Sequence, residues 1–328
     1  MTARRSPARR PDPCPRRRPF GRRRMHVCSP ADGSVPSARA EVALRSRPSA
    51  PRCSRCLYTI TGVVTATAGV QSPLTKSETQ VRQPPDSVHI IVVYDNNQYA
   101  PTLRTGWGLA VLVVSHGSVA LFDTGADGPT LLANMRALSI DPRLIDAVVL
   151  SHAHSDHTGG LDGLLDTGIR PTVYLLPSFP EDFKRHLRSR VPVVETEGGQ
   201  EVLAGVSTTG DLDGGIREQA LVVETARGLV VVTGCAHPGV ARMVARVVSR
   251  RTEPVHLVLG GFHLRDATPD QIQAIITEFR RLGVERVAPC HCTGDRAIEM
   301  FAAEYGEDFL RAGVGTTIVV GAVPSGAR

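Results

Sequence analysis

A short apolar segment that runs directly into a histidine-rich loop constrains this chain more than any other feature. Residues 145–150 read I-D-A-V-V-L, and the ten residues that follow read S-H-A-H-S-D-H-T-G-G. A β-rich apolar run of this length predicts a buried strand. Such a strand would deliver the polar side chains that follow it to one edge of a sheet, so the fold must bring several titratable groups together there.

The histidine-rich loop has the composition of a metal site. It contains His152, His154, Asp156 and His157 within six positions, although only 11 of the 328 residues are histidine. Imidazole nitrogen and carboxylate oxygen are common ligands of divalent metals. His152 and His154 can face one ion, whereas Asp156 and His157, further round the turn, can face a second. A polar surface loop is the alternative interpretation.

The basic charge of the chain belongs to its N-terminal part. Residues 1–55 hold 15 Arg against three acids, a balance of +12, whereas the whole chain has a balance of +6, so the remainder carries −6. A nucleic-acid-binding domain would need basic residues clustered on its folded part. We therefore expect the folded domain to bind no nucleic acid.

The first 85 residues are rich in Arg, Pro and Ser, a composition that buries too little apolar surface to offset the entropy of ordering. We predict that residues 1–85 are a disordered extension and that residues 86–328 form one domain. Three interpretations of the extension remain open: an over-extended translation start, an arm that binds nucleic acid or another anionic surface, and a targeting segment. No apolar stretch reaches the roughly 18 residues that a transmembrane helix needs.

Short apolar runs separated by turns follow from about residue 87. Strands are predicted at residues 88–94, 108–114, 119–122, 172–176, 191–194, 200–203, 220–225, 229–233, 255–259, 286–288 and 316–320, in addition to 145–150. Helices are predicted at 130–138, 161–165, 180–190, 240–249, 269–282 and 296–305. The first half is expected to be rich in antiparallel strands and the second half to alternate strands with helices. Two sheets packed face to face with helices outside, an α/β sandwich, fit this pattern.

Further candidate site residues stand at predicted strand ends. Asp123 in F-D-T-G is either a turn residue or a carboxylate that orients a metal-binding imidazole. Cys235 and His237 in T-G-C-A-H-P-G are candidate ligands, although a buried Cys is also common in cores. His263 in G-G-F-H is a ligand, a substrate-facing catalytic group or a solvent-exposed loop residue. His291 in C-H-C-T-G is a further candidate ligand.

Two flanking cysteines, Cys290 and Cys292, point away from His291 if their segment is extended, so we expect them to pack in the interior. Asn96 and Asn97, after the first strand, are candidates for binding polar groups of a substrate. Free thiols beside histidines favour a reducing, cytoplasmic compartment. Export through an N-terminal signal is the alternative.

Together these motifs resemble the metallo-β-lactamase superfamily. Its H-x-H-x-D-H motif matches His152, His154, Asp156 and His157, and its first motif matches Asp123. The resemblance implies a four-layer αββα sandwich with a two-metal site at one edge of the sheets. In this superfamily the later motifs are a histidine, an acid and a last histidine. Cys235 stands where the acid is usual, with His237 beside it, and His291 matches the last histidine.

The residues of these motifs further resemble those of a subgroup of metal-dependent hydrolases that includes the archaeal 7,8-dihydropterin-6-methyl-4-(β-D-ribofuranosyl)aminobenzene 5′-phosphate synthase. The first functional hypothesis is a binuclear metallohydrolase, in which a metal-activated water attacks an ester or phosphoester. The second is a transferase that condenses a dihydropterin pyrophosphate with a ribofuranosylaminobenzene phosphate. The third is a metal-binding or redox-sensing protein without catalysis.

The hydrolase hypothesis assigns the ligands to two ions. His152, His154 and His237 would hold one, and Asp156, His157 and His291 the other, with Cys235 or His263 in support. Asp156 would also orient the water. Histidine-rich ligation favours Zn²⁺, with Fe and Mn as alternatives. The expected partner is a small-molecule substrate.

Overall fold

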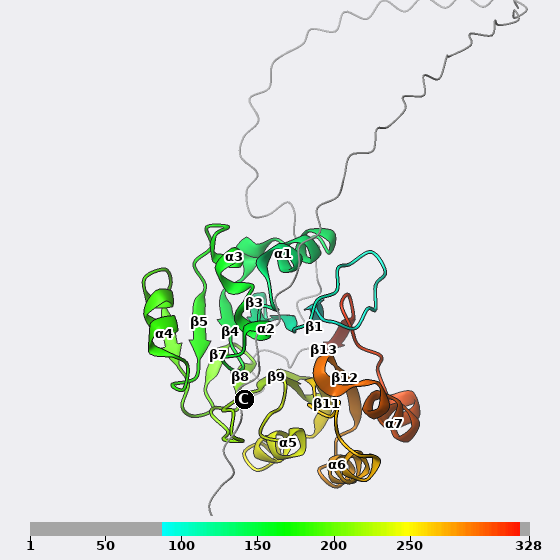
Figure 1. Cartoon of the computed structure of the whole chain (residues 1–328). Helices are drawn as coiled ribbons and strands as arrows, with labels where there is room; N and C mark the ends of the chain where they lie inside the picture. Colours follow the sequence, from blue (N-terminus) through cyan, green and yellow to red (C-terminus); the bar gives the residue numbers. More distant parts are fainter. Residues whose placement is uncertain (1–86, 322–328) are drawn as a thin grey trace, which may run out of the picture. The chain divides into compact units, whose positions relative to one another are not determined.

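Two mixed β-sheets face each other across a shared apolar core (Figure 1). The computed structural model describes residues 87–321. The first sheet has the strand order β13-β1-β2-β3-β4-β5-β6. Its strands are β1 (Ser87–Tyr94), β2 (Ala110–Ser115), β3 (Ser118–Phe122), β4 (Ala147–Val149), β5 (Thr172–Leu175), β6 (Val193–Glu195) and β13 (Thr317–Gly321).

The second sheet has the order β12-β11-β10-β9-β8-β7. Its strands are β7 (Glu201–Leu203), β8 (Val206–Thr208), β9 (Leu221–Thr225), β10 (Gly228–Thr233), β11 (Val255–Gly261) and β12 (Arg286–Cys290). Between the two sheets lie buried apolar side chains that alternate along the strands, as the pleat requires. They include Val111 and Phe122 from the first sheet and Val230 and Leu257 from the second.

Helices cover the outer face of each sheet (Figure 1). On the first sheet these are α1 (Gly128–Ala137), α3 (Leu161–Leu165) and α4 (Glu181–Arg188), and on the second α5 (Val240–Val248), α6 (Pro269–Arg281) and α7 (Asp295–Tyr305). Each group buries its apolar side against the sheet beneath it; Leu131 of α1 and Ile276 of α6 are examples. This arrangement confirms the predicted αββα sandwich.

Strand direction explains why the polar motifs meet. Strands β3 to β6 pair in parallel in the first sheet, and β10, β11 and β12 pair in parallel in the second. The carboxyl ends of parallel strands lie at one edge of a sheet. In the register, Phe122 pairs with Val149, and Gly261 pairs with Cys290. The segments that follow β3, β4, β10, β11 and β12 therefore emerge together.

The structure differs from the predicted elements in several places. The histidine loop contains a short helix, α2 (Ser155–Thr158), and the hairpin strand β8 is additional. The residues after β12 form a 3₁₀ turn, His291–Thr293, and are not extended. The first half is also less antiparallel than expected, since β3 to β6 are parallel, because helices cross between them.

Strand β13 returns from the end of the chain to pair with β1 in the first sheet. The predictions for residues 1–85, including the disordered extension, lie outside the described residues. Within residues 87–321, no helix is long and apolar enough to cross a membrane.

Candidate metal centre

A buried carboxylate after β3 anchors the histidine loop that follows β4. Asp123 is fully buried. Its Oδ1 accepts a hydrogen bond from the backbone amide of Ser151 (2.7 Å), and its Oδ2 accepts one from the Ser151 hydroxyl (2.7 Å). The same Oδ2 lies 2.7 Å from Nδ1 of His157. An imidazole held through Nδ1 presents Nε2 outward, which is the orientation a metal ligand needs.

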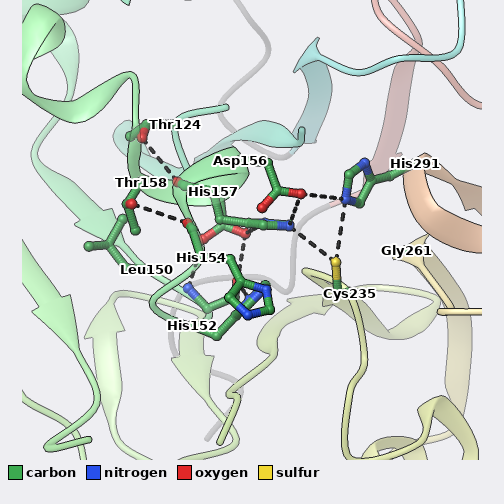
Figure 2. A network of polar contacts seen from close by, with 12 residues as sticks. Thr124, Leu150, His152, His154, Asp156, His157, Thr158, Cys235, Gly261 and His291 are labelled. Carbon is green, nitrogen blue, oxygen red and sulfur yellow. Dashed lines mark hydrogen bonds and ion pairs between the residues drawn. The ribbon is translucent and has the colours of Figure 1, made fainter. Parts of the chain in front are cut away.

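Four side chains converge beyond Asp123 (Figure 2). Nε2 of His157 lies 3.2 Å from Sγ of Cys235 and 3.6 Å from Oδ2 of Asp156. Nε2 of His291 lies 3.4 Å from the same sulfur and 3.5 Å from the same oxygen. Ligands arranged tetrahedrally about 2.1 Å from a zinc ion would lie roughly 3.4 Å apart. The spacing of these four atoms therefore fits a single ion at their centre.

A second group of donors shares Cys235. His152, Cys235 and His237 place one donor atom each within 4.8 Å of the others. Nε2 of His152 and Nδ1 of His154 face each other at 3.1 Å, and Nε2 of His237 is buried with no hydrogen-bond partner among residues 87–321. An unpartnered buried nitrogen is costly, so its orientation toward the cluster fits a metal ion as the missing partner.

A second buried carboxylate, which the sequence analysis missed, anchors the loop after β10. Glu218 is fully buried, and its Oε1 accepts the backbone amides of Cys235 (2.9 Å) and Ala236 (2.8 Å). Its Oε2 accepts the amide of His237 (2.9 Å). A Cβ at Gly234 would lie 2.3 Å from the Ser151 hydroxyl oxygen, so only glycine allows this loop to approach the histidine loop so closely.

Four residues at the cluster have backbone conformations that residues other than glycine rarely adopt. Asp123, Ala236, His263 and His291 all have positive φ, between 51° and 61°. A non-glycine residue in this region is strained, and such residues concentrate at functional sites. Each of these four residues follows the end of a different strand.

Burial and charge set the protonation of the cluster. Burial and the surrounding histidines hold the pKa of His152 well below its usual range, and burial together with His263 lowers the pKa of His237 to about 4. Both imidazoles are therefore neutral near pH 7, the form that binds metal. For His157, burial is outweighed by Asp123, which raises the pKa to about 9.

The pKa values of Glu218 and Asp156 are shifted in opposite directions. Burial raises the pKa of Glu218 to about 7. Burial also acts to raise the pKa of Asp156, but its contacts with His291 and His157 prevail and lower that pKa to about 2. Asp156 is therefore ionised at neutral pH and can serve as an anionic ligand.

Asn96 contacts the candidate ligand His291, which the sequence did not indicate. Its Oδ1 lies 2.8 Å from Nδ1 of His291, and its Nδ2 donates to the His291 backbone oxygen (3.1 Å). These contacts orient His291. The backbone amide of Asn97 donates a hydrogen bond to Oδ1 of the buried Asp95 (2.6 Å). The side-chain Nδ2 of Asn97 has no hydrogen-bond partner among the described residues.

The remaining candidates divide between the interior and the rim. Cys290 is fully buried, whereas the Cys292 thiol lies with Cys235 and His263 in a third group of possible ligands. Both cysteines are buried, as expected, but the segment is a 3₁₀ turn and not extended, so the Cys292 thiol does not point away from the cluster. His263 is exposed, with its ring centroid 4.4 Å from that of His237.

One cavity described in residues 87–321 lies apart from this cluster. It has a volume of about 300 Å³ and lies between β7–β9 and α5, where Arg246 and Arg250 line it. No metal-ligand candidate borders it.

Comparison with known proteins identifies the family. The model of the metallo-β-lactamase superfamily matches residues 105–291, which include Asp123, Asp156, Cys235 and all the histidines of the cluster. The chain belongs to this superfamily. A relative from Methanocaldococcus jannaschii, named 7,8-dihydropterin-6-methyl-4-(β-D-ribofuranosyl)-aminobenzene-5′-phosphate synthase, is 32% identical, and the match covers 60% of this chain and 83% of the relative.

Solved structures agree with this superfamily assignment. A metal-dependent hydrolase of the β-lactamase superfamily, Tm1679, is 28% identical with a TM-score of 0.62, over 70% of this chain and 98% of that one. A diphosphatase from the PhnP family has a TM-score of 0.51 at 16% identity, over 72% of this chain and 98% of that one. The second likeness shows the fold alone.

Proposed function

We propose that this superfamily member is a metal-dependent hydrolase with two divalent ions, and that Zn²⁺ is the preferred metal. The observation that carries the proposal is the spacing of Asp156, His157, Cys235 and His291, whose donor atoms all lie within 4.8 Å of one another and so can share one ion. His152, His154 and His237 would hold the other ion. Cys235 belongs to both groups of donors, so its sulfur would be available as a ligand to either ion.

When bound, the ions would supply Lewis-acid chemistry, which lowers the pKa of water toward 7 and polarises an ester or phosphoester. The protein contributes orientation. Asp156 is half-buried and ionised, so its carboxylate would accept a hydrogen bond from the attacking water and direct it. His263 is exposed beside His237 and would donate a proton to the leaving group.

Replacing His154 by Ala tests the proposal. The variant should lose tight binding of one ion and reduce hydrolysis of bis(p-nitrophenyl) phosphate by at least about a hundredfold, since metal-activated water would no longer be held. His186→Ala is the matched control, because His186 lies on the surface of α4 and pairs with Asp162 at 2.8 Å. Full activity of His154→Ala with unchanged metal content would contradict the proposal.

The 32% identical relative named as a synthase favours a second candidate, a transferase that condenses a dihydropterin pyrophosphate with an aryl ribotide. In that case the ions would stabilise a pyrophosphate leaving group. Incubation with both substrates, followed by mass spectrometry, separates the two candidates. A condensation product favours the transferase, whereas hydrolysis without condensation favours the hydrolase.

A further inference from the structure

An aromatic side chain and an arginine lie beside the donor cluster, and the proposed hydrolysis uses neither. Trp107, the only tryptophan of the chain, lies between β1 and β2 and is 44% exposed. Its ring centroid is 5.1 Å from that of His291. The guanidinium carbon of Arg265, in the segment after β11, lies 4.8 Å from the centroid of the Trp107 ring. One loop from each sheet therefore meets the other at the rim of the cluster.

The charge of Arg265 is available to a ligand. Arg265 is exposed, and among residues 87–321 no carboxylate forms an ion pair with it. The comparison with Arg280 is informative: this residue stacks on Tyr305 at 3.8 Å but also pairs with Glu304 at 3.2 Å. Both arginines pack on an aromatic ring, but only the one beside the cluster lacks an acidic partner.

The geometry of the pair suits a phosphate group. A guanidinium offers five N–H donors in one plane and binds phosphate through two parallel hydrogen bonds. An aromatic face beneath the guanidinium attracts it and limits its freedom, which leaves the edge of the plane for an anion. Arg104, another cation of the β1–β2 loop, is tied through its main chain to Asn134 of α1 (2.8 Å), and it makes no contact with Trp107 that could hold it similarly.

The exposed side of the cluster includes this rim. His152, His157 and His291 are buried, whereas His154 and His263, the latter two residues before Arg265, are exposed. A substrate must approach from an exposed side. A phosphate group bound by Arg265 would then lie close to His291, because the Trp107 ring contacts both residues.

We propose that Arg265, supported by the Trp107 ring, binds a phosphate group of the substrate and makes the site selective for organic phosphates over uncharged esters. This inference rests on the proposed function, since it concerns the substrate of the same metal centre. Arg265 and Trp107 act in binding and not in the bond-breaking step. Their replacement is therefore expected to change KM more than kcat.

Binding of phenyl phosphate to the full-length protein tests the inference without requiring turnover. Isothermal titration calorimetry gives the Kd, and quenching of the Trp107 fluorescence reports whether the ligand reaches the rim. Because a charge-assisted hydrogen bond contributes about 1.5–3 kcal/mol, Arg265→Gln should raise the Kd by about tenfold to a hundredfold. Arg265→Lys should lie in between, because an ammonium keeps the charge but loses the planar pair of donors.

Arg280→Gln is the matched control, since it also removes an arginine from an aromatic ring but lies on α6 away from the cluster, and its Kd should equal that of the unmodified protein. An Arg265→Gln protein with an unchanged Kd would overturn the inference, as would failure of the unmodified protein to bind phenyl phosphate at millimolar concentration. Hydrolysis of bis(p-nitrophenyl) phosphate is measured separately. Arg265-dependent binding without hydrolysis would leave the inference standing and reject the proposed function, whereas hydrolysis with an Arg265-independent Kd and KM would do the reverse.

Discussion

Two buried carboxylates, one next to a strand of each sheet, hold the two halves of the donor cluster in different ways. Asp123 contacts the histidine loop through side chains as well as backbone, since it binds Ser151 and the imidazole of His157. Glu218 holds the Cys235–His237 loop through three backbone amides alone. Asp123 therefore fixes the direction of one ligand, whereas Glu218 fixes the path of a loop that carries two.

The difference bears on what sequence can reveal. Asp123 stands in a motif that follows an apolar strand, so its role can be suspected from the residues beside it. Glu218 stands before β9 in R-E-Q-A, with no histidine or cysteine nearby in sequence. Its role depends on a loop 17 to 19 residues away. Its partners there are backbone amides, which every residue except proline has, so the residue types of the loop do not reveal the contact.

Removing Asp123 should have the largest effect. Asp123→Ala leaves the amide and hydroxyl of Ser151 and the Nδ1 of His157 without their acceptor in the interior. The cost to the free energy of unfolding should be about 4 kcal/mol, and metal should be lost because His157 is no longer oriented. Urea unfolding and elemental analysis check both effects. Asp146→Ala, which removes an exposed carboxylate that accepts one amide from Val119, should cost less than about 1 kcal/mol.

Removing Glu218 should destabilise the protein somewhat less. Glu218→Ala leaves three buried amides unpaired, which should lower the free energy of unfolding by about 3 kcal/mol after partial relaxation. The ion that depends on His237 should be lost first, because this loop carries that ligand. If Glu218→Ala kept both ions and full stability, the contrast between the two carboxylates would be wrong.

The pH dependence of stability should distinguish Glu218 further. Burial raises its pKa to about 7 from an ordinary value of 4.5, so folding favours its protonated form. In metal-free protein this contribution is complete below pH 4.5 and is lost as the pH rises to 7, on the order of 1 kcal/mol per pH unit. Glu218→Gln keeps one acceptor oxygen and cannot titrate, so its unfolding curve should lack this slope. Parallel pH profiles for the two proteins would contradict the assignment.

Ser151 should give the smallest effect, although it lies between the two halves. Its hydroxyl donates to Asp123 and lies 2.8 Å from Nδ1 of His152. Ser151→Ala retains the backbone contact to Asp123 and should cost about 1 kcal/mol of unfolding free energy, with a few-fold weaker metal binding. A loss as large as that of Asp123→Ala would show that the hydroxyl, and not the carboxylate, organises the histidine loop.

Local patterns predicted most of the fold. Alternating and continuous apolar runs located the strands and helices that frame the site, and the strand ends indicated where the ligands would gather. Patterns could not predict that β13 pairs with β1, because this contact joins opposite ends of the domain. They also missed α2, a single turn with no apolar face of its own.

The candidate site was predictable where residue type itself indicates the chemistry. Asp156, Cys235 and the predicted histidines other than His154 fall into groups of possible ligands, and His154 contacts His152. Contacts between distant polar residues were not predictable. Asn96 binds both the ring and the backbone of His291, a contact that nothing in the sequence indicates, and its predicted contact with substrate stays a prediction.

The most direct test of the central claim is the location of metal in crystals of the full-length protein purified without chelator. Anomalous difference maps collected above and below the zinc absorption edge should show two peaks roughly 3.5–4 Å apart. One peak should lie among Asp156, His157, Cys235 and His291, and the other beside His152, His154 and His237. A single peak, peaks elsewhere, or none in protein that retains activity would contradict the claim that these residues form a two-metal centre.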